Sequence, residues 1–320
     1  MPASEITTRL SRAATSVMTA LFACLAALPA RAILINGEGP ADVTGIYDRF
    51  IVGTYPGTPV APPVANPSFI GSAFDLSGVG WLSSDPSQAV TLVSSMYFVG
   101  ATHYMPNGGS TLLFLGTDHV LYSATVDAVH ALTYTGTDGA QVSDVSVGRL
   151  TLALPTAVTP MPIFYAGNTS VFSASSFNAY SGVSLFNYGH TARMGTNGLD
   201  GFAQFSFAPG PRTNIGLVYS LGTGAGETLL EGGDSGSPTI ASQNGVYGLI
   251  GTHSGVSGSF SLDGFVSYTE FVNQMNVILG TDGQSLTFAT VPEPGAMLFG
   301  VLLLGFCGTQ RMRRGRDAGR

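Results

Sequence analysis

Glycine recurs throughout this chain: 43 of its 320 residues are glycine, and they show no Gly-X-Y period. Between the glycines lie short runs of aliphatic, β-branched and aromatic residues, as at positions 89–93, 111–115, 149–154 and 216–221. Runs of this kind, broken by Gly, Asn-Gly or Asp-Gly, are typical of short β-strands joined by tight turns. We therefore expect an all-β fold, either a barrel or a sandwich.

Two segments depart from the strand pattern. Phe271, Met275 and Ile278 are spaced by four and three residues, which predicts one helix over residues 268–279. The proline-rich stretch at 55–67 predicts an extended surface loop. The expected body is therefore a set of strands followed by a single helix.

Charge and cysteine content exclude several functions for the body of the chain. All twelve basic residues are arginine, and only four lie between positions 33 and 291, against sixteen acidic residues. A net charge of −12 is the opposite of what a phosphate-binding surface needs, so nucleic acid is not an expected partner. Cys24 and Cys307 lie near the chain ends, which excludes a disulfide, a four-cysteine zinc site or a thiol nucleophile in the body.

Residues 1–32 have the order of a secretory signal peptide. Two arginines precede an apolar core at residues 17–28, and Pro29 and the triplet Ala-Arg-Ala follow it. The core is short for a membrane-spanning helix. We expect signal peptidase to cleave after Ala32, and the alternative is an anchor that stays attached.

Residues 292–320 contain a Pro-Glu-Pro triplet, an apolar run at 295–308 and an arginine-rich tail, in that order. They resemble the PEP-CTERM sorting signal of Gram-negative bacteria, in which an exosortase handles the tail and the protein moves outward. As a helix the apolar run reaches only about 21 Å, short of the roughly 30 Å hydrocarbon core, which predicts a transient association with the inner membrane. The two ends together imply an exported body in the periplasm, at the cell surface or in the extracellular matrix.

Residues 231–238 read Glu-Gly-Gly-Asp-Ser-Gly-Ser-Pro and place Ser235 among glycines. A tight glycine turn exposes a serine hydroxyl while neighbouring backbone N–H groups point at one spot, as nucleophilic attack and oxyanion stabilisation require. The segment resembles the nucleophile loop of trypsin-like serine proteases. Ser237 replaces the second glycine of most trypsins, a variation shared with bacterial glutamyl endopeptidases. The alternative is a glycine-rich β-turn with an incidental serine.

A base for this serine is expected upstream. His103 ends the run Met-Tyr-Phe-Val-Gly-Ala-Thr-His, which resembles the trypsin-family strand in which small residues precede the base. Residues 77–81 resemble the strand that leads toward it in many bacterial members. Similar flanks are missing from the other histidines, His119, His130, His190 and His253. We therefore identify His103 as the candidate base.

Asp144 is the candidate third member, which would orient the imidazole and stabilise its cation. It precedes Val-Ser-Val-Gly-Arg-Leu-Thr-Leu, which is similar to the family's Asp-Ile-Ala-Leu-x-Arg-Leu strand. It lies 41 residues after the base and 91 before the serine, close to the spacing of the family. Alternatives that precede less similar runs are Asp118, Asp127 and Asp138.

The resemblance covers residues 78–279, including a strand at 246–255 that would pair with extended substrate and a closing strand and helix at 266–279. It implies two six-stranded antiparallel barrels within a domain at 33–285, the first at about 45–155 and the second at about 160–280. The active site would lie in the cleft between them. A linker at 286–291 would join this domain to the sorting signal.

The resemblance also implies the remaining roles. Ser235 would attack the peptide carbonyl, and the backbone N–H groups of Gly233 and Ser235 would bind the oxyanion. Asp234 would pair with a newly made amine, and cleavage after Ala32 would create one at Ile33. Alternatively, Ile33 begins an edge strand and Asp234 bonds within its own loop. No cofactor or metal is implied.

The residues expected to line the substrate pocket do not favour a substrate with a basic side chain at P1. Leu229, six residues before the candidate nucleophile, replaces the aspartate that gives trypsins their basic preference. His253, followed by Ser254 and Gly255 on the substrate-pairing strand, stands where glutamyl endopeptidases carry the histidine that receives a P1 carboxylate. Leu230 replaces their accompanying threonine, so a preference for glutamate is a hypothesis.

Two other functions stay open from the sequence. One is a catalytically inactive trypsin-like shell that serves in adhesion or matrix structure. The other is a metal enzyme that uses scattered histidines and aspartates, although neither an HExxH nor a His-x-His pattern occurs. The intact Ser, His and Asp set favours a secreted serine endopeptidase acting on protein or peptide substrates.

Overall fold

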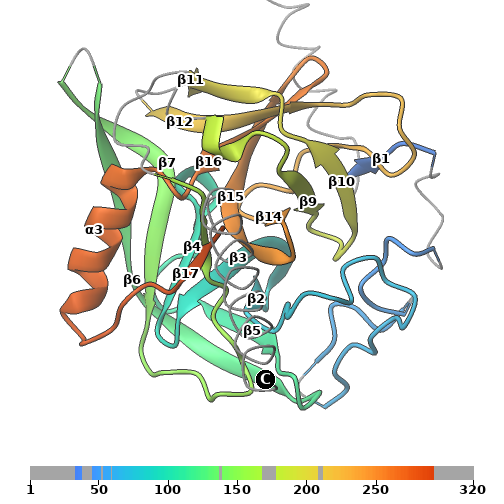
Figure 1. Cartoon of the computed structure of the whole chain (residues 1–320). Coiled ribbons are helices and arrows are strands. Elements are labelled where there is room, and N and C mark those ends of the chain that lie inside the picture. Colours follow the sequence, from blue (N-terminus) through green and yellow to red (C-terminus); the bar gives the residue numbers. More distant parts are fainter. Residues whose placement is uncertain are drawn as a thin grey trace, which may run out of the picture.

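The structure is a computed structural model that describes residues 33–37, 45–51, 53–58, 60–136, 139–167, 178–207 and 212–291. Its body is mostly β-strand with one α-helix, as the glycine-punctuated sequence predicts (Figure 1). The expected signal peptide at 1–32 and sorting signal at 292–320 lie outside the described residues. Within the described part of the chain, no helix has the length and apolarity needed to cross a membrane.

The first half of the body is a closed ring of six antiparallel strands. They are β2 (Val79–Leu82), β3 (Asp85–Ser94), β4 (Tyr97–Ala101), β5 (Thr111–Leu115), β6 (Leu121–Gly136) and β7 (Gly139–Leu150). Ladders join β2 to β3, β3 to β4, β4 to β7, β7 to β6, β6 to β5 and β5 back to β2. Every strand therefore has two neighbours, and the ring leaves no free edge.

The inside of this ring is apolar. Phe98 of β4 and Phe114 of β5 fill it, and Gly148 and Gly80 leave the room they occupy. A Cβ atom at Gly148 would lie 2.1 Å from the Phe98 ring, and one at Gly80 would lie 2.4 Å from the Phe114 ring. The two glycines are thus packing positions rather than turns.

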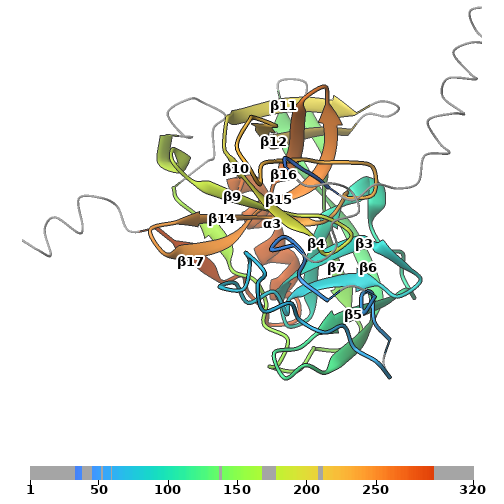
Figure 2. The same cartoon turned by 90° about the vertical axis from the view of Figure 1, so that its right-hand side faces the viewer.

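The second half has a longer and open path of strands. Its members are β9 (Ser184–Tyr188), β10 (Met194–Gly198), β11 (Gly201–Phe207), β12 (Arg212–Ser220), β14 (Pro238–Gln243), β15 (Val246–Ser257) and β16 (Phe260–Phe265). They run in the order β10-β9-β14-β15-β16-β12-β11, and β12 continues to β7 of the first ring through one parallel pairing. Figure 2 shows these strands above those of the first ring.

Short strands and 3₁₀ turns complete the body. The strands are β1 (Leu34–Ile35), β8 (Ile163–Tyr165), β13 (Thr228–Leu229) and β17 (Phe288–Thr290), and the turns are η1 (Thr102–Tyr104) and η2 (Asn178–Tyr180). The β1 strand pairs only with β13, and β8 joins β15 to β17 by parallel pairings.

The architecture corrects two expectations and leaves a third unconfirmed. The ladders confirm one closed six-stranded ring, whereas among the described residues no ladder joins β10 to β11 or β12, so a second closed barrel is not confirmed. The strand predicted at 149–154 is wrong beyond Leu150, where β7 ends. Leu154 instead donates its N–H to the Ser95 carbonyl (2.8 Å), and Pro155 follows. The closing strand expected from residue 266 ends one position earlier, at Phe265.

The predicted terminal helix is present as α3 (Thr269–Gly280). Phe271, Met275 and Leu279 are buried on its inner face. The helix packs beside β6 (Figure 1). There the Gln274 side chain accepts a hydrogen bond from the Thr133 N–H at 3.0 Å. Helix α3 therefore ties the end of the second half to the first ring.

Candidate active site

His103 lies in η1, immediately after the fully buried strand β4. The β4–β7 ladder pairs Ala101 with Val145, which brings Asp144 beside the turn that carries His103. His103 Nδ1 is 2.8 Å from Asp144 Oδ2 and 3.0 Å from Oδ1, and the His103 N–H donates to Oδ1 at 3.0 Å. The aspartate is buried and the imidazole is about one third exposed, so part of the ring stays open to solvent.

The turn before the histidine is itself held to β7. Thr102 Oγ1 donates to the Ser143 carbonyl (3.0 Å) and lies 2.7 Å from Ser146 Oγ. These contacts flank Asp144 on both sides along the strand. Thr102, the hydroxyl-bearing residue before the histidine, therefore helps to fix the orientation of His103.

Ser235 comes from the other half of the molecule, in the loop between β13 and β14. Its Oγ lies 2.8 Å from His103 Nε2, across the boundary between the two strand systems. The structure thus brings together the three residues selected from the sequence, in the order hydroxyl, imidazole, carboxylate. A hydroxyl within hydrogen-bond reach of a base that a third group orients is the arrangement of an activated nucleophile.

The shape of the nucleophile loop depends on two glycines. Gly233 has φ +107° and Gly236 has φ +86°, both in the region that side chains disfavour. A Cβ atom at Gly236 would also lie 2.7 Å from the Ala89 carbonyl oxygen of β3. Gly236 therefore allows the loop to approach the first ring closely enough for Ser235 to reach His103.

The backbone around the serine leaves two donors for a ligand. Asp234 donates its N–H to the Glu231 carbonyl, and Gly236 donates to the His253 carbonyl. In the part of the chain that the structure describes, the N–H groups of Gly233 and Ser235 donate to no protein acceptor. They are therefore available to hold a developing oxyanion.

Asp234 is buried, and its partner in the structure is His190. The Nδ1 atom and the N–H of His190 lie 2.8 Å and 3.0 Å from Asp234 Oδ1, and the Glu231 N–H donates to Oδ2 at 2.8 Å. The Ile33 side chain is also buried nearby, since a Cβ atom at Gly189 would lie 2.6 Å from it and 2.9 Å from Asp234 Oδ1. Sequence reasoning treated His190 only as a rival base and missed this contact, because the two residues are 44 positions apart.

The residues predicted to bind substrate lie in less open positions. His253 is fully buried, with Nδ1 2.8 Å from Asp263 Oδ1 and Nε2 3.1 Å from the Tyr188 carbonyl oxygen. Ser254 is buried beside it, and Gly255 pairs with Leu262 at the end of the buried part of β15. Both ring nitrogens of His253 thus face protein acceptors. A carboxylate at P1 would have to displace one of them to reach this imidazole.

Leu229 lies on β13, where it pairs with Leu34 of β1 and is half-buried. The next residue, Leu230, is buried and donates its N–H to Ser261 Oγ at 3.0 Å. This segment therefore presents no charged side chain toward the loop that carries the nucleophile.

The sequence did not predict a polar cluster of Asp85, Ser87 and Tyr104 that lies next to His103. Asp85 Oδ1 accepts hydrogen bonds from Ser87, and Oδ2 accepts one from the Tyr104 hydroxyl at 3.1 Å. The Ser87 hydrogen bond lowers the pKa of Asp85, and burial raises the pKa of Tyr104. The Tyr104 ring stacks near the His103 ring, with centroids 6.4 Å apart. The cluster therefore holds a carboxylate against Tyr104, the residue that follows the candidate base.

The rival residues are placed elsewhere. His119 lies in the turn between β5 and β6, and His130 lies on an exposed part of β6. Asp118 bonds to Tyr122, and Asp127 pairs with Arg149. Across the described ranges, no group of three or more His, Cys, Asp or Glu side chains is arranged to hold a metal ion. The third rival aspartate, Asp138, lies outside the described residues.

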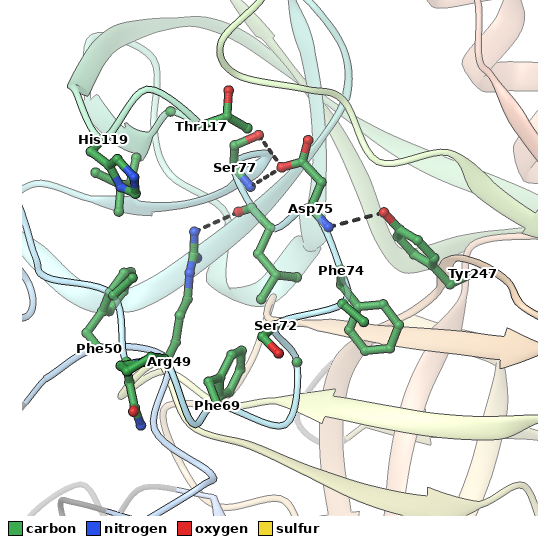
Figure 3. A pocket seen from close by; sticks show the side chains of 18 residues that line it. Arg49, Phe50, Phe69, Ser72, Phe74, Asp75, Ser77, Thr117, His119 and Tyr247 are labelled. Atoms are coloured by element: carbon green, nitrogen blue, oxygen red, sulfur yellow. Dashed lines mark hydrogen bonds between the residues drawn. The ribbon is translucent and has the colours of Figure 1, made fainter.

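A cavity of about 590 Å³ lies apart from His103, Asp144 and Ser235, between the segment that precedes β2, the turn after β5 with His119, and Tyr247 (Figure 3). The charged side chains that line the cavity form hydrogen bonds with other residues of its wall. Arg49 Nη2 donates to the Leu76 carbonyl at 2.9 Å, and Asp75 Oδ1 accepts from the hydroxyl of Ser77 at 2.6 Å. The cavity contains none of the predicted site residues, and we assign it no ligand.

Comparisons with known proteins were made for the sequence and for the structure. No family model matches the chain, and no curated protein matches its sequence. Among solved structures, a mutant of human heparin binding protein is 13% identical with a TM-score of 0.46, over 65% of this chain and 94% of that chain. The NS6 protease from murine norovirus 1 is 16% identical with a TM-score of 0.35, over 57% of this chain and 88% of that chain. With TM-scores below 0.5, these similarities do not by themselves define a fold family or an activity.

Proposed function

We propose that this chain is a serine endopeptidase of the trypsin-like kind that cleaves peptide bonds through an acyl-enzyme. One observation carries the proposal: Ser235 Oγ lies 2.8 Å from His103 Nε2, while the buried Asp144 carboxylate bonds the opposite nitrogen of the same ring. The two free N–H groups of the nucleophile loop support it, because a transferred acyl group needs donors at its oxygen.

The geometry suggests the following steps. Ser235 Oγ attacks the scissile carbonyl carbon as its proton passes to His103 Nε2, and the N–H groups of Gly233 and Ser235 stabilise the resulting oxyanion. The tetrahedral intermediate then expels the amine, which takes the proton from His103 and leaves an ester at Ser235. Water attacks that ester as its proton passes to His103, the bond to Ser235 Oγ then breaks, the carboxylic acid product leaves, and Ser235 Oγ takes the proton back from His103. Asp144 keeps the imidazole oriented and stabilises its cation throughout.

The main alternative is a catalytically inactive protein of the same shape with an adhesive or structural role. The two functions differ in whether the serine hydroxyl reacts. A fluorophosphonate probe should label wild-type protein at Ser235 in a 1:1 ratio, and peptide hydrolysis should fall by about 10⁶-fold in Ser235→Ala. Ser84→Ala, which removes a hydroxyl from an exposed turn, is the matched control and should keep both reactions.

The outcome that contradicts the proposal is equally direct. Wild-type protein that folds but is neither labelled nor hydrolytic would favour the inactive shell. Hydrolysis that persists in Ser235→Ala would remove the serine mechanism, and hydrolysis lost on chelation would favour a metal enzyme.

We further propose that the body is exported. Signal peptidase would cleave after Ala32, and an exosortase would process the tail beyond residue 291 while it is transiently in the inner membrane. The acidic body would then work in the periplasm, at the cell surface or in the extracellular matrix. Intact-mass and N-terminal sequencing of protein recovered from each fraction tests this, since a chain that keeps residues 1–32 or stays in the cytoplasm would contradict it.

Two finer points belong to the same proposal. The amine created at Ile33 would reach Asp234, which the burial of Ile33 beside Gly189 supports. A mature N-terminus other than Ile33 would count against this coupling. A preference for glutamate at P1 would need His253, and substrates that differ only at P1 test it: faster cleavage after Arg or Phe would contradict the glutamate hypothesis.

A further inference from the structure

The buried contact between His190 and Asp234 has no part in the proton transfers proposed above. However, Asp234 immediately precedes the proposed nucleophile, Ser235. His190 is 6% exposed and Asp234 is fully buried. One oxygen of the carboxylate accepts both the N–H and Nδ1 of His190, and the other accepts the Glu231 N–H. A buried carboxylate is costly unless it is paired and hydrogen-bonded, so these donors account for its stability inside the protein.

The His190 ring also packs against the loop that carries the proposed oxyanion N–H groups. A Cβ atom at Gly233 would lie 3.3 Å from both Nδ1 and Cε1 of His190, so the ring packs against the backbone of Gly233. Asp234, the next residue, is fixed by the same ring through its side chain. One imidazole therefore touches the two residues that immediately precede Ser235.

His190 is itself held firmly by its surroundings. It follows β9 in a turn closed by the Gly189 N–H to the Arg193 carbonyl (2.7 Å), and Ala192 in that turn has φ +61°. The Tyr55 hydroxyl donates to the His190 carbonyl at 3.1 Å from the segment before the first ring. Hydrogen bonds within the turn and from Tyr55 therefore hold the backbone of His190, in addition to the contact between its imidazole and Asp234.

The other end of the nucleophile loop is fixed separately. His253 accepts the Gly236 N–H at its carbonyl and donates its own N–H to the Ser237 carbonyl, both at 2.9 Å. Its ring donates from Nε2 to the Tyr188 carbonyl, two residues before His190. The downstream side of the loop therefore has backbone bonds to β15, whereas on the upstream side the His190 side chain contacts Gly233 and Asp234.

We infer that His190 is a positioning residue for the proposed peptidase: through Asp234 and Gly233 it holds the oxyanion N–H groups in place. This inference rests on the proposed function. It also implies that a residue within the fold already holds the loop in a chain that still carries residues 1–32, before any new amine forms at Ile33. The expected signature is a change in kcat with little change in KM, because an oxyanion forms only in the transition state.

Two substitutions separate this role from general packing. Asn can place an amide N–H near the position of Nδ1, whereas Leu has a similar size and no donor. We expect His190→Leu to lower kcat by about 10²- to 10³-fold, the loss typical of a disabled oxyanion donor. His190→Asn should restore most of that loss, and KM for a peptide substrate should stay within about threefold of wild type in both, as uniform binding is not affected.

The measurements are steady-state kcat and KM on the exported protein, the rate of fluorophosphonate labelling at Ser235, and thermal stability. Wild-type protein that is not labelled would overturn the proposed function and this inference together. Labelled and hydrolytic wild-type protein, with His190→Leu equal to it in kcat, would overturn the inference alone and would favour the Ile33 amine as the partner of Asp234.

If His190→Leu does not fold, the comparison moves to His190→Gln and His190→Asn. The Gln amide corresponds to Nε2 rather than to Nδ1, so it does not match the donor facing Asp234 Oδ1. We expect a kcat at least tenfold lower for Gln than for Asn at equal thermal stability. Equal kcat values in the two variants would overturn the inference.

Discussion

The two halves that meet at the candidate site are stabilised in different ways. The first ring is closed by its ladders, and its interior is apolar, formed around Phe98 and Phe114. The second half is open in its ladders, and polar side chains with bonds to one another are buried within it. They are Asn187, Asn197, Thr228, Thr239, His253 and Asp263.

The two halves also position their reacting side chains in different ways. His103 and Asp144 are positioned by the β4–β7 ladder, so their distance is set mainly by backbone hydrogen bonds. Ser235 lies in a glycine-rich loop that has no ladder of its own, and the loop is held both by backbone hydrogen bonds to β15 and by side chains such as His190. We expect substitutions of single polar residues to affect the second half more locally than core substitutions affect the first.

The largest effect in the first ring should come from Asp144→Asn. The substitution keeps the size of the side chain but removes the charge that orients the His103 ring, and the proposed mechanism predicts a loss of about 10⁴-fold in kcat. The ladder should keep the fold intact, which circular dichroism can check. Asp118→Asn, at an exposed carboxylate that was a rival in the sequence, is the control. A loss of less than tenfold in Asp144→Asn would contradict the assigned role.

Phe98→Ala tests whether the first ring depends on its apolar interior. The substitution leaves a cavity inside a closed ring that cannot easily collapse, so we expect the free energy of unfolding to fall by about 3–5 kcal/mol. Denaturant titration measures this loss, and Val129→Ala on an exposed part of β6 should change stability little. A Phe98→Ala loss near that of Val129→Ala would mean that the ladders, not the core, hold the ring.

Thr239→Val is the corresponding test in the second half. The Thr239 hydroxyl contacts the Asp263 carboxylate and lies 2.9 Å from Asn187 Oδ1. Valine has the same shape without the hydroxyl, so a buried partner is left unsatisfied at a cost of about 1–3 kcal/mol. Thermal unfolding of this variant beside Phe98→Ala would show which half limits stability. No loss in Thr239→Val would indicate that the polar network contributes little.

The sequence predicted the parts of the site that depend on local pattern. Ser235 is marked by its glycines and His103 by the small residues before it, because a tight turn and a strand end leave direct traces in neighbouring residues. Contacts between distant residues leave no such trace. The His190–Asp234 pair and the enclosure of His253 by Asp263 and Tyr188 arise only when β9, β15 and β16 come together. For the same reason, the ladders that join the described strands of the second half could not be predicted from those strands one by one.

The smallest expected effect concerns the surface link between the halves. Asp282, just after α3, accepts hydrogen bonds from Arg149 Nε of β7 and from the Tyr97 hydroxyl of β4, both at 2.6 Å. Its pKa is lowered, chiefly by the Arg149 hydrogen bond. A carboxyl group with a lowered folded pKa stabilises the protein above its ordinary pKa of about 3.9, and this contribution is lost as the pH falls further.

Asp282→Asn should therefore lower the melting temperature slightly at pH 7, and the difference from wild type should shrink as the pH falls below about 4. The Arg149 and Asp282 side chains are partly exposed, so salt should also reduce the difference. Melting curves at several pH values measure both trends. A difference that stays constant with pH would mean that the link acts through packing of the Tyr97 hydroxyl, and that the two halves are joined at this edge by shape and not by charge.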